Sequence, residues 1–504
     1  MSVLDLWMYV LTPLAVLCVQ RHCVRTRGWM CDGFALFFGL LVFGLIHAIC
    51  GRALVSAFAT VLCFAGLGFC NVAKERALRG ESLTFADVTL LRQVVEHPKL
   101  YLPFLPWKAM LAGLFLALPL FWLLANLEYP ARSCFDLVPL FFLGLCFVVA
   151  KTKLGRVVLR FAKEMIPLTL STQDLATIGP LACVFWHGLW HVGMQGLSGI
   201  RGSCDQPFAE PLWGKGWRKH RYVSKPDIVV IQAESFCDPR VYLAPNDAQS
   251  LPENYLATFD AMSKEGALLD FGVHAYGAYT MRTEYEVLTG IPPQDLGTDA
   301  FHPYWRVAKR PSWSIAWYLK CLGYTTVLLH PYAKSFFYRD RAIPHLGFDR
   351  FVALEDLVDP VYFGPYVSDT FLATLLCQWV GEKPLFCFVI TMENHGPWDA
   401  ARLTFSHPLL AHIPAPIGPY LLHTMHTDSM LATLRTSYPK KLLLALYGDH
   451  LPNIPSLIPS NATHTPCLLW GAEVFRSKQG VIAPANLGGI LLDAMANEGI
   501  SEDM

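Results

Sequence analysis

Five long apolar stretches occupy most of the first 150 residues of this 504-residue chain. Nearly free of charge, they cover residues 6–19, 34–50, 53–70, 110–127 and 137–150. The middle three approach the ~20 residues that a helix needs to span a bilayer, and Trp107, Trp122 and Tyr129 lie near stretch ends like interfacial anchors. Uniformly apolar helices also occur in soluble cores, but five in so short a segment favour a polytopic membrane domain of about five helices over residues 1–155.

Charge and cysteine usage exclude some partners and folds. Lys and Arg together number 40, and Asp and Glu also number 40, so the formal net charge is zero. Domains that bind nucleic acids concentrate positive charge against the phosphates, so we expect no nucleic-acid partner. The 15 cysteines include no CxxC pair, which argues against a zinc knuckle or a disulfide framework.

Basic residues fall mainly in alternate connections between the apolar stretches, within 21–27, 74–99 and 151–163. Basic loops usually face the cytoplasm. Five crossings would then leave the C-terminal part in the cytoplasm as well, and a sixth would move it to the other side. Residues 178–200 are apolar enough to cross, to lie at the interface or to pack on a soluble domain, so we assign 156–220 as a linker that contains this helix.

From about residue 221 onward, short apolar runs alternate with longer mixed segments. Four runs that read as strands buried on both faces cover 227–232, 325–330, 384–391 and 441–447. Helical segments would lie between them at 312–322, 367–380 and 423–437. Continuous apolar strands that alternate with helices are typical of a parallel sheet covered on both faces. We therefore predict an α/β domain with a central, mostly parallel sheet over residues 221–504.

Acidic and imidazole side chains follow each of these four strands. They are Glu234, His330, the Glu393-Asn394-His395 run and the Asp449-His450 pair. Because the carboxyl ends of parallel strands line the ligand crevice of an open α/β sheet, we expect these groups to converge. Carboxylate and imidazole ligands suit a divalent cation. A single histidine beside a strand is usually structural, but the repetition at four strand ends predicts a metal-dependent active site.

A Gly-containing loop over 274–279 leads into an apparent helix that begins near Thr280. The backbone N–H groups and the positive dipole end at a helix start attract an anionic substrate, so the Thr280 hydroxyl is a candidate nucleophile. In the other interpretation, Thr280 is an N-cap whose capping box is completed by Thr283 or Glu284. This motif alone does not choose between the two.

Five sequence blocks follow one another in the order IQAESF, AYTMRTEYEVLTGI, LLHPYAKSFFYRDRAIPHLGFDRF, ITMENHGPW and YGDHLP. Together they resemble the lipoteichoic acid synthase family of membrane phosphoglycerol transferases, within the alkaline phosphatase and sulfatase superfamily. The resemblance covers most of residues 225–504. The apolar N-terminal region fits the five-helix architecture of that family as well.

The resemblance implies a nucleophile and a cation site. Thr280 would be the nucleophile, which is a weak one until a bound cation lowers the pKa of its hydroxyl. One divalent ion would be held by four residues, namely Glu234, Thr280, Asp449 and His450. Manganese is typical of the family, and magnesium or zinc would suit similar ligands.

The resemblance also implies a substrate pocket. His395 would face the head group as an acid or base, and Arg339 would bind the phosphate through charge-assisted hydrogen bonds. His330 and Phe337 would line the pocket. The family usually has Trp near Phe337 and an acidic residue near Tyr332, so this chain departs at the positions that contact glycerol. Because of this difference, the resemblance does not determine the head group of the phospholipid donor.

The implied activity is transfer of a phosphoglycerol-type group from a membrane phospholipid to a hydroxyl of a cell-envelope glycan or polymer, through a phospho-threonine intermediate. Its partners would be the phospholipid donor, the acceptor and the lipid bilayer. Family precedent places such a protein in the bacterial cytoplasmic membrane, with several crossings and the catalytic domain on the extracytoplasmic face. Five crossings under the charge rule contradict that placement.

Three alternatives stay open. Phosphoethanolamine transferases of the superfamily generally carry further zinc ligands and disulfides, which the scattered cysteines do not suggest. A sulfatase needs Cys or Ser in a C-x-P-x-R-type motif, whereas Thr280 occupies the matching position and Cys237-Asp-Pro-Arg240 is a near miss. A catalytically silent membrane scaffold would have lost a cation ligand or the nucleophile, and none is lost.

Overall fold

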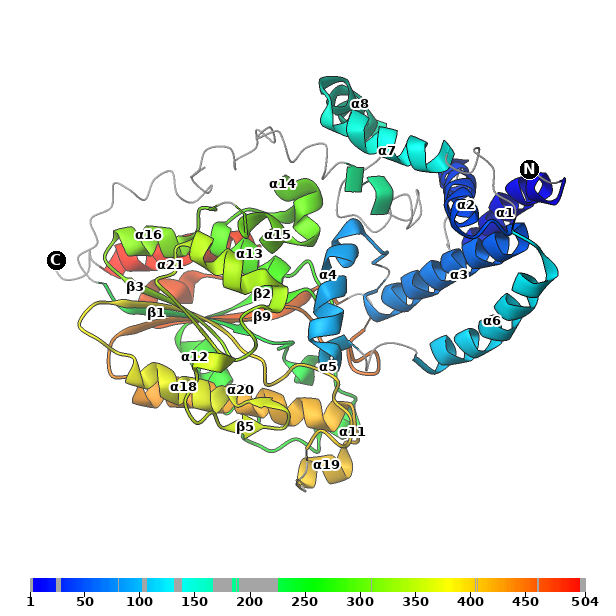
Figure 1. The fold of residues 1–504 in the computed structure, drawn as a ribbon. Helices are drawn as coiled ribbons and strands as arrows, with labels where there is room; N and C mark the ends of the chain where they lie inside the picture. The colour runs from blue at the N-terminus through cyan, green and yellow to red at the C-terminus, as the bar shows by residue number, and fades with distance from the viewer. Residues whose placement is uncertain are drawn as a thin grey trace. The chain divides into compact units, whose positions relative to one another are not determined.

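A computed structural model gives the fold of the chain (Figure 1). It describes residues 3–23, 29–79, 81–101, 107–130, 138–165, 184–186, 188–189, 225–309, 311–403, 405, 407–459 and 462–498. Contacts divide the chain into two compact units, Met1–Arg201 and Gly202–Met504. Most of the predicted linker over 156–220 lies outside the described residues.

The N-terminal unit is helical, as predicted. Within its described part, four helices are long and apolar enough to cross a membrane. They are α1 (Val3–Cys23), α2 (Trp29–Cys50), α3 (Ala53–Ala77) and α6 (Trp107–Leu127). The fifth apolar stretch forms the shorter α7 (Val138–Lys151), and at 14 residues it is shorter than the ~20 residues of an ordinary span.

Polar contacts at the helix ends show that neighbouring helices run in opposite directions. The end of α1 meets the start of α2 through an ion pair between Arg21 and Asp32 at 2.6 Å. The start of α1 meets the end of α2, where the Asp5 carboxylate lies 3.6 Å from the His47 imidazole. The Glu128 carboxylate, just beyond α6, accepts hydrogen bonds from the first two amides of α3. The basic residues at the ends of α1 and α3 therefore share one side of the bundle.

Three further helices of this unit are α4 (Phe85–Glu96), α5 (Pro98–Tyr101) and α8 (Lys153–Met165). A capping box between Thr84 and Asp87 begins α4. The Asp87 carboxylate also pairs with Lys74 at 2.8 Å, which ties α4 to the end of α3.

The C-terminal unit is built on an eight-stranded sheet in the order β10-β2-β9-β8-β1-β7-β3-β4. Its strands are β1 (Asp227–Ala233), β2 (Ala267–Gly272), β3 (Thr325–His330), β4 (Arg350–Ala353), β7 (Leu385–Ile390), β8 (Leu442–Gly448), β9 (His464–Trp470) and β10 (Val481–Ile482). The strands from β8 to β4 are parallel, and β9 runs antiparallel to its two neighbours. The four predicted strands are β8, β1, β7 and β3, which lie side by side at the centre.

Helices cover both faces of this sheet (Figure 1). One face carries α13 (Thr280–Thr289), α15 (Pro303–Val307), α16 (Ile315–Cys321) and α21 (Leu487–Glu498). The other face carries α12 (Ala257–Glu265), α18 (Asp369–Gln378) and α20 (Ile417–Ser437), and the main hydrophobic core lies between these helices and the sheet. The predicted α/β fold with a mostly parallel sheet is confirmed, and α16, α18 and α20 lie within or overlap the three predicted helical segments.

Short elements complete this unit. They are α11 (Pro245–Ala248), α14 (Pro293–Leu296), α17 (Arg339–Ala342), α19 (Pro408–His412) and the two-stranded hairpin of β5 (Tyr362–Phe363) and β6 (Tyr366–Val367).

Candidate active site

The carboxyl ends of the four central strands lie together at one edge of the sheet. In the parallel registers, Ala233 pairs with Gly448, Gln232 with Ile390, and Leu329 with Val389. The residues that follow these strands therefore start at the same height along the strand direction. This register brings the acidic and histidine side chains that follow the four strands to a single edge of the sheet.

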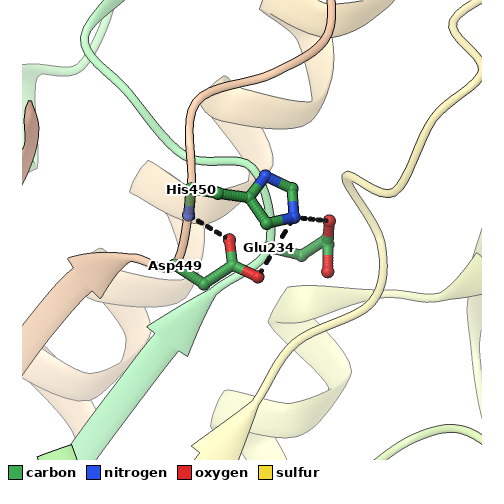
Figure 2. A group of neighbouring side chains, drawn as sticks. All are labelled: Glu234, Asp449 and His450. Atoms are coloured by element: carbon green, nitrogen blue, oxygen red, sulfur yellow. Dashed lines mark hydrogen bonds and ion pairs between the residues drawn. The ribbon is translucent and has the colours of Figure 1, made fainter. Parts of the chain in front are cut away.

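Glu234, Asp449 and His450 form a buried group whose ligand atoms all lie within 4.8 Å of one another (Figure 2). The His450 Nε2 atom is 3.5 Å from the Glu234 Oε1 atom and 3.5 Å from the Asp449 Oδ2 atom. The amides of Ser235 and His450 donate to the Asp449 Oδ1 atom at 2.8 and 2.9 Å. These amide contacts fix the carboxylate without using its second oxygen.

The chemistry of this group fits a divalent cation. Burial and the neighbouring Glu234 carboxylate raise the pKa of Asp449 to about 7, although His450, the Ser235 amide and the Thr280 hydroxyl act in the opposite direction. Burial alone would lower the pKa of His450, but the two carboxylates outweigh it and raise that pKa. The buried Asp449 Oδ2 atom has no hydrogen-bond partner among the described residues. A cation bound there would neutralise the two carboxylates and supply that partner.

Thr280 begins α13 next to this group. Its hydroxyl is near enough to Asp449 to lower the pKa of that carboxyl. The N-cap of α13 is Tyr279, which makes no side-chain cap bond. The Thr283 hydroxyl donates to the Asp449 carbonyl oxygen at 2.8 Å instead of capping the helix. The capping-box interpretation of Thr280 is therefore wrong.

Left-handed backbone conformations flank three of the site residues. Ser235 follows Glu234 with φ 52°, Tyr279 precedes Thr280 with φ 65°, and Tyr338 precedes Arg339 with φ 59°. Such conformations are uncommon for residues other than glycine. They cost on the order of 1–3 kcal/mol each, and they persist where the surrounding structure holds them, commonly at functional sites.

Arg339 is fully buried, and its guanidinium binds the Glu284 carboxylate through two nitrogens. The Nη2 atom donates to Oε2 at 2.6 Å and the Nε atom donates to Oε1 at 3.2 Å. The Tyr304 hydroxyl donates to the same carboxylate. The Arg339 Nη1 atom lies 3.2 Å from the His330 Nε2 atom. Since arginine only donates, His330 accepts there and keeps its proton on Nδ1, 3.3 Å from the Ile390 carbonyl oxygen.

The structure places the two remaining pocket residues as follows. Phe337 is buried beside Arg339, with the guanidinium 5.4 Å from its ring centre. His395 is half-buried, and its Nδ1 atom lies 2.7 Å from the Gly396 carbonyl oxygen. Burial and the positive charges of His450 and Arg402 lower the pKa of His395 to about 4, against the effect of the Gly396 carbonyl. The imidazole is therefore neutral near pH 7, with Nδ1 protonated and Nε2 available to accept a proton.

Two groups of buried residues were missed in the sequence. Glu284 was noted there only as a member of a capping box, and its pairing with Arg339 joins positions 55 residues apart. Arg402 and His423 contact the strand end that carries Glu393. His423 stands within a long helical segment, where no local pattern distinguishes a functional histidine from a structural one.

The near miss to a sulfatase motif has a structural role. The Arg240 guanidinium is held by the Asp238 and Asp260 carboxylates at 2.8 and 2.7 Å. The Cys237 thiol is buried against the Tyr420 hydroxyl at 3.1 Å, and burial keeps the pKa of that thiol above its usual range. These contacts do not resemble an exposed, reactive cysteine.

The fold is that of an α/β domain of the alkaline phosphatase type, with acidic and histidine side chains that could hold a metal ion at the carboxyl ends of parallel strands. A model of the sulfatase family matches residues 226–497, which is more than half of the chain. The chain belongs to this family, and the resemblance found in the sequence is thereby confirmed at family level.

Curated relatives and solved structures add further similarity. The capsular polysaccharide biosynthesis protein RkpI of Rhizobium meliloti is 28% identical over 440 residues, covering 82% of this chain and 77% of that protein. A putative cyclic beta-1,2-glucan modification protein of the same organism is 26% identical over 52% of this chain and 44% of its own length. The lipoteichoic acid synthase LtaP of Listeria monocytogenes shares 18% identity over 55% of this chain and 73% of that structure, with a TM-score of 0.43.

Proposed function

We propose that this protein transfers a phosphoglycerol-type group from a membrane phospholipid to a hydroxyl group of a cell-envelope glycan or polymer. The observation that carries the proposal is the position of Thr280 at the start of α13, beside the buried group of Glu234, Asp449 and His450. This position gives a hydroxyl nucleophile a cation site and a helix N-terminus for the phosphoryl oxygens.

Each residue has a role in a two-step transfer. The Thr280 Oγ atom attacks phosphorus, and the bond from phosphorus to the diacylglycerol oxygen breaks. The His395 Nε2 atom takes the proton of the Thr280 hydroxyl and passes it to that leaving oxygen. In the second step it takes the proton of the acceptor hydroxyl, whose oxygen attacks the phospho-threonine, and returns that proton to the Thr280 oxygen as Thr280 is released. Arg339 would bind the phosphoryl oxygens once the substrate displaces a neighbour of its guanidinium, which is 1% exposed and lies against Glu284 and His330. Glu234, Thr280, Asp449 and His450 would hold a divalent ion, manganese in our proposal, which when bound would neutralise phosphoryl charge and lower the pKa of the nucleophile.

The relatives support a glycan acceptor. One is named for capsular polysaccharide biosynthesis and the other for modification of a cyclic glucan. Both names describe polymers rich in hydroxyl groups. A donor embedded in the bilayer would leave its diacylglycerol there, which agrees with a catalytic unit joined to membrane helices.

The proposal is tested with the full-length protein in detergent, loaded with manganese and supplied with fluorescent phosphatidylglycerol, fluorescent phosphatidylethanolamine or an aryl sulfate. We expect diacylglycerol release from phosphatidylglycerol only, and loss of release after chelation. Release from phosphatidylethanolamine alone would favour the phosphoethanolamine transferase, and cleavage of the sulfate would favour the hydrolase. No turnover of any of the three would favour the silent scaffold.

We further propose a sixth membrane crossing, which places the catalytic unit on the extracytoplasmic face of the bacterial cytoplasmic membrane. Phe185 lies in the apolar stretch 178–200 and packs against Phe38 of α2 and Phe147 of α7, with ring centres 4.8 and 6.2 Å apart. Phe38 is near the middle of α2, so if α2 spans the membrane this contact would lie within the bilayer. A sixth crossing lets the basic connections stay in the cytoplasm while the catalytic unit meets lipid head groups and glycans outside.

Reporter fusions check this arrangement. A periplasmic phosphatase fused after Met504 should be active, and a cytoplasmic fluorophore at the same position should be dark. The same two reporters fused after Lys163 should give the opposite pattern and serve as the control. A fluorescent fusion after Met504 would contradict the sixth crossing.

A further inference from the structure

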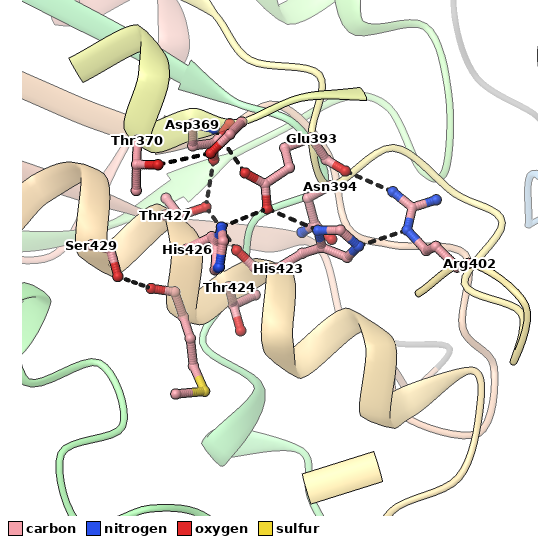
Figure 3. A network of polar contacts seen from close by, with 12 residues as sticks. Asp369, Thr370, Glu393, Asn394, Arg402, His423, Thr424, His426, Thr427 and Ser429 are labelled. Atoms are coloured by element: carbon pink, nitrogen blue, oxygen red, sulfur yellow. Dashed lines mark hydrogen bonds and ion pairs between the residues drawn. The ribbon is translucent and has the colours of Figure 1, made fainter. Parts of the chain in front are cut away.

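A second buried polar network surrounds Glu393 (Figure 3). It shares no residue with the cation group of Glu234, Asp449 and His450, although Asp369 and Arg402 are near enough to interact electrostatically with Glu234. At its centre is the Glu393 carboxylate, which is fully buried at the end of β7. The His423 Nδ1 atom lies 2.9 Å from the Glu393 Oε1 atom, and the His426 Nδ1 atom lies 3.4 Å from it. The Asp369 amide donates to the Glu393 Oε2 atom at 2.7 Å. Each carboxylate oxygen is thus held from a different helix, α20 or α18.

Arg402 connects this network to the strand end that carries His395. Its Nε atom donates to the His423 Nε2 atom at 2.6 Å, its Nη2 atom to the Glu393 carbonyl oxygen at 2.6 Å, and its Nη1 atom to the Pro397 carbonyl oxygen at 2.9 Å. Since arginine only donates, His423 accepts at Nε2. The neutral His423 ring therefore carries its proton on Nδ1 and donates it to Glu393.

These contacts enclose the segment 393–397. Arg402 binds the carbonyl groups at its two ends, and His395 lies between them. The ring of Tyr366, from the β5–β6 hairpin, is 5.8 Å from the His395 ring and 5.6 Å from the Arg402 guanidinium. Arg402 and Glu393 carry opposite charges and are buried, and replacing buried charges of this kind by apolar side chains of the same size is often neutral or stabilising. The chain of contacts from Glu393 through His423 to Arg402, which we call the relay, ends on the backbone around His395. The geometry that the relay imposes on this backbone is therefore a better explanation for it than stability.

We infer that Arg402, His423 and Glu393 are positioning residues that hold segment 393–397 and so aim the His395 imidazole at the cation group. The inference rests on the proposed function only for the proton-transfer role of His395. A misplacement of a reacting group by about 1 Å can cost on the order of 100-fold in rate, so the relay affects the chemical step more than substrate binding.

The kinetic test compares two substitutions of His423 in the full-length, manganese-loaded protein. His423→Phe removes both ring contacts, whereas the amide of His423→Gln can donate to Glu393 and accept from Arg402. With fluorescent phosphatidylglycerol, His423→Phe should lower kcat about 10- to 100-fold with KM and manganese affinity unchanged within about twofold, and His423→Gln should keep most of the wild-type rate. Arg435→Gln, which breaks an exposed ion pair on the same helix, is the control and should match the wild type.

A double-mutant cycle separates positioning from a general loss of structure. If His423 acts through His395, His423→Phe should cost nothing further in a His395→Ala background, because energies of coupled residues are not additive. An equal loss of kcat in both backgrounds, or a parallel fall in manganese affinity, would overturn the inference.

Hydrogen exchange provides a test that needs no donor. Amide protection within 393–398 should fall in His423→Phe and in Arg402→Lys, while the segment 448–451 around Asp449 keeps its protection. Unchanged protection in 393–398 would contradict the positioning role even if the protein proved active on phosphatidylglycerol. Lowered protection there, in a protein that releases no diacylglycerol, would support the positioning role and show that the proposed phospholipid donor is wrong.

Discussion

Thr280→Ala should abolish diacylglycerol release from phosphatidylglycerol, with a loss of at least ~1,000-fold, because removal of a covalent nucleophile leaves only binding and electrostatic effects. The measurement is manganese-dependent release by the full-length protein in detergent, with mass analysis of the peptide that contains residue 280. Wild-type protein trapped without an acceptor should show an added phosphoglycerol group on that peptide, and the variant should not.

Two further substitutions sharpen this result. Thr280→Ser keeps a hydroxyl and should retain measurable release. Thr289→Ala, at the other end of α13, removes a buried hydroxyl that donates to the Tyr285 carbonyl oxygen and accepts from the Ile291 amide. It should leave the rate close to that of the wild type. Unchanged release by Thr280→Ala would remove the nucleophile from the proposed mechanism.

Arg339→Ala should destabilise the catalytic unit strongly, in addition to any loss of activity. The guanidinium and its partner Glu284 are 1% and 0% exposed, so truncation leaves a buried carboxylate without its counter-charge. Breaking such a pair from one side costs about 3–5 kcal/mol. The measurement is the denaturation midpoint of the full-length protein, followed by tryptophan fluorescence in detergent.

The matched control is Lys334→Ala, five residues earlier in the chain. Lys334 pairs with Asp356 at 2.7 Å, and both side chains are more than a third exposed at 39% and 38%. Exposed pairs contribute about 0–1 kcal/mol, so the midpoint should hardly move. The double substitution of Arg339 and Glu284 by leucine should recover much of the stability, because it removes both charges together. Equal effects of Arg339→Ala and Lys334→Ala would contradict a dry, buried pair.

The sequence was sufficient to predict the four central strands of the sheet, but not the strands on either side of them. Central strands such as β1 and β8 are buried along their whole length and appear as continuous apolar runs. By contrast, β2 alternates buried and exposed residues, and β10 has only two residues. Short or half-buried strands of this kind have no strong apolar signature, so their positions depend on tertiary pairing.

The same distinction holds within the candidate site. Glu234, Asp449 and His450 directly follow central strands, so strand register alone brings them to one edge. Glu284 and His423 lie on helices, and their partners are set by how those helices pack on the sheet. A linear pattern does not record helix packing, so these contacts were visible only in three dimensions.

The position of β1 at the centre of the sheet has a consequence for how the protein is made. Its hydrogen-bonding neighbours are β7 and β8, and its residue Gln232 contacts Tyr447, which is synthesised 215 residues later. During translation one edge of β1 stays unpaired until β7 (Leu385–Ile390) has been made, and the other until β8 (Leu442–Gly448) has been made. Such delayed long-range pairing is slow and exposed to aggregation. We therefore expect folding of the C-terminal unit to benefit from chaperones. A chain stopped before Leu442 lacks β8, Asp449 and His450, and can complete neither the sheet nor the cation group.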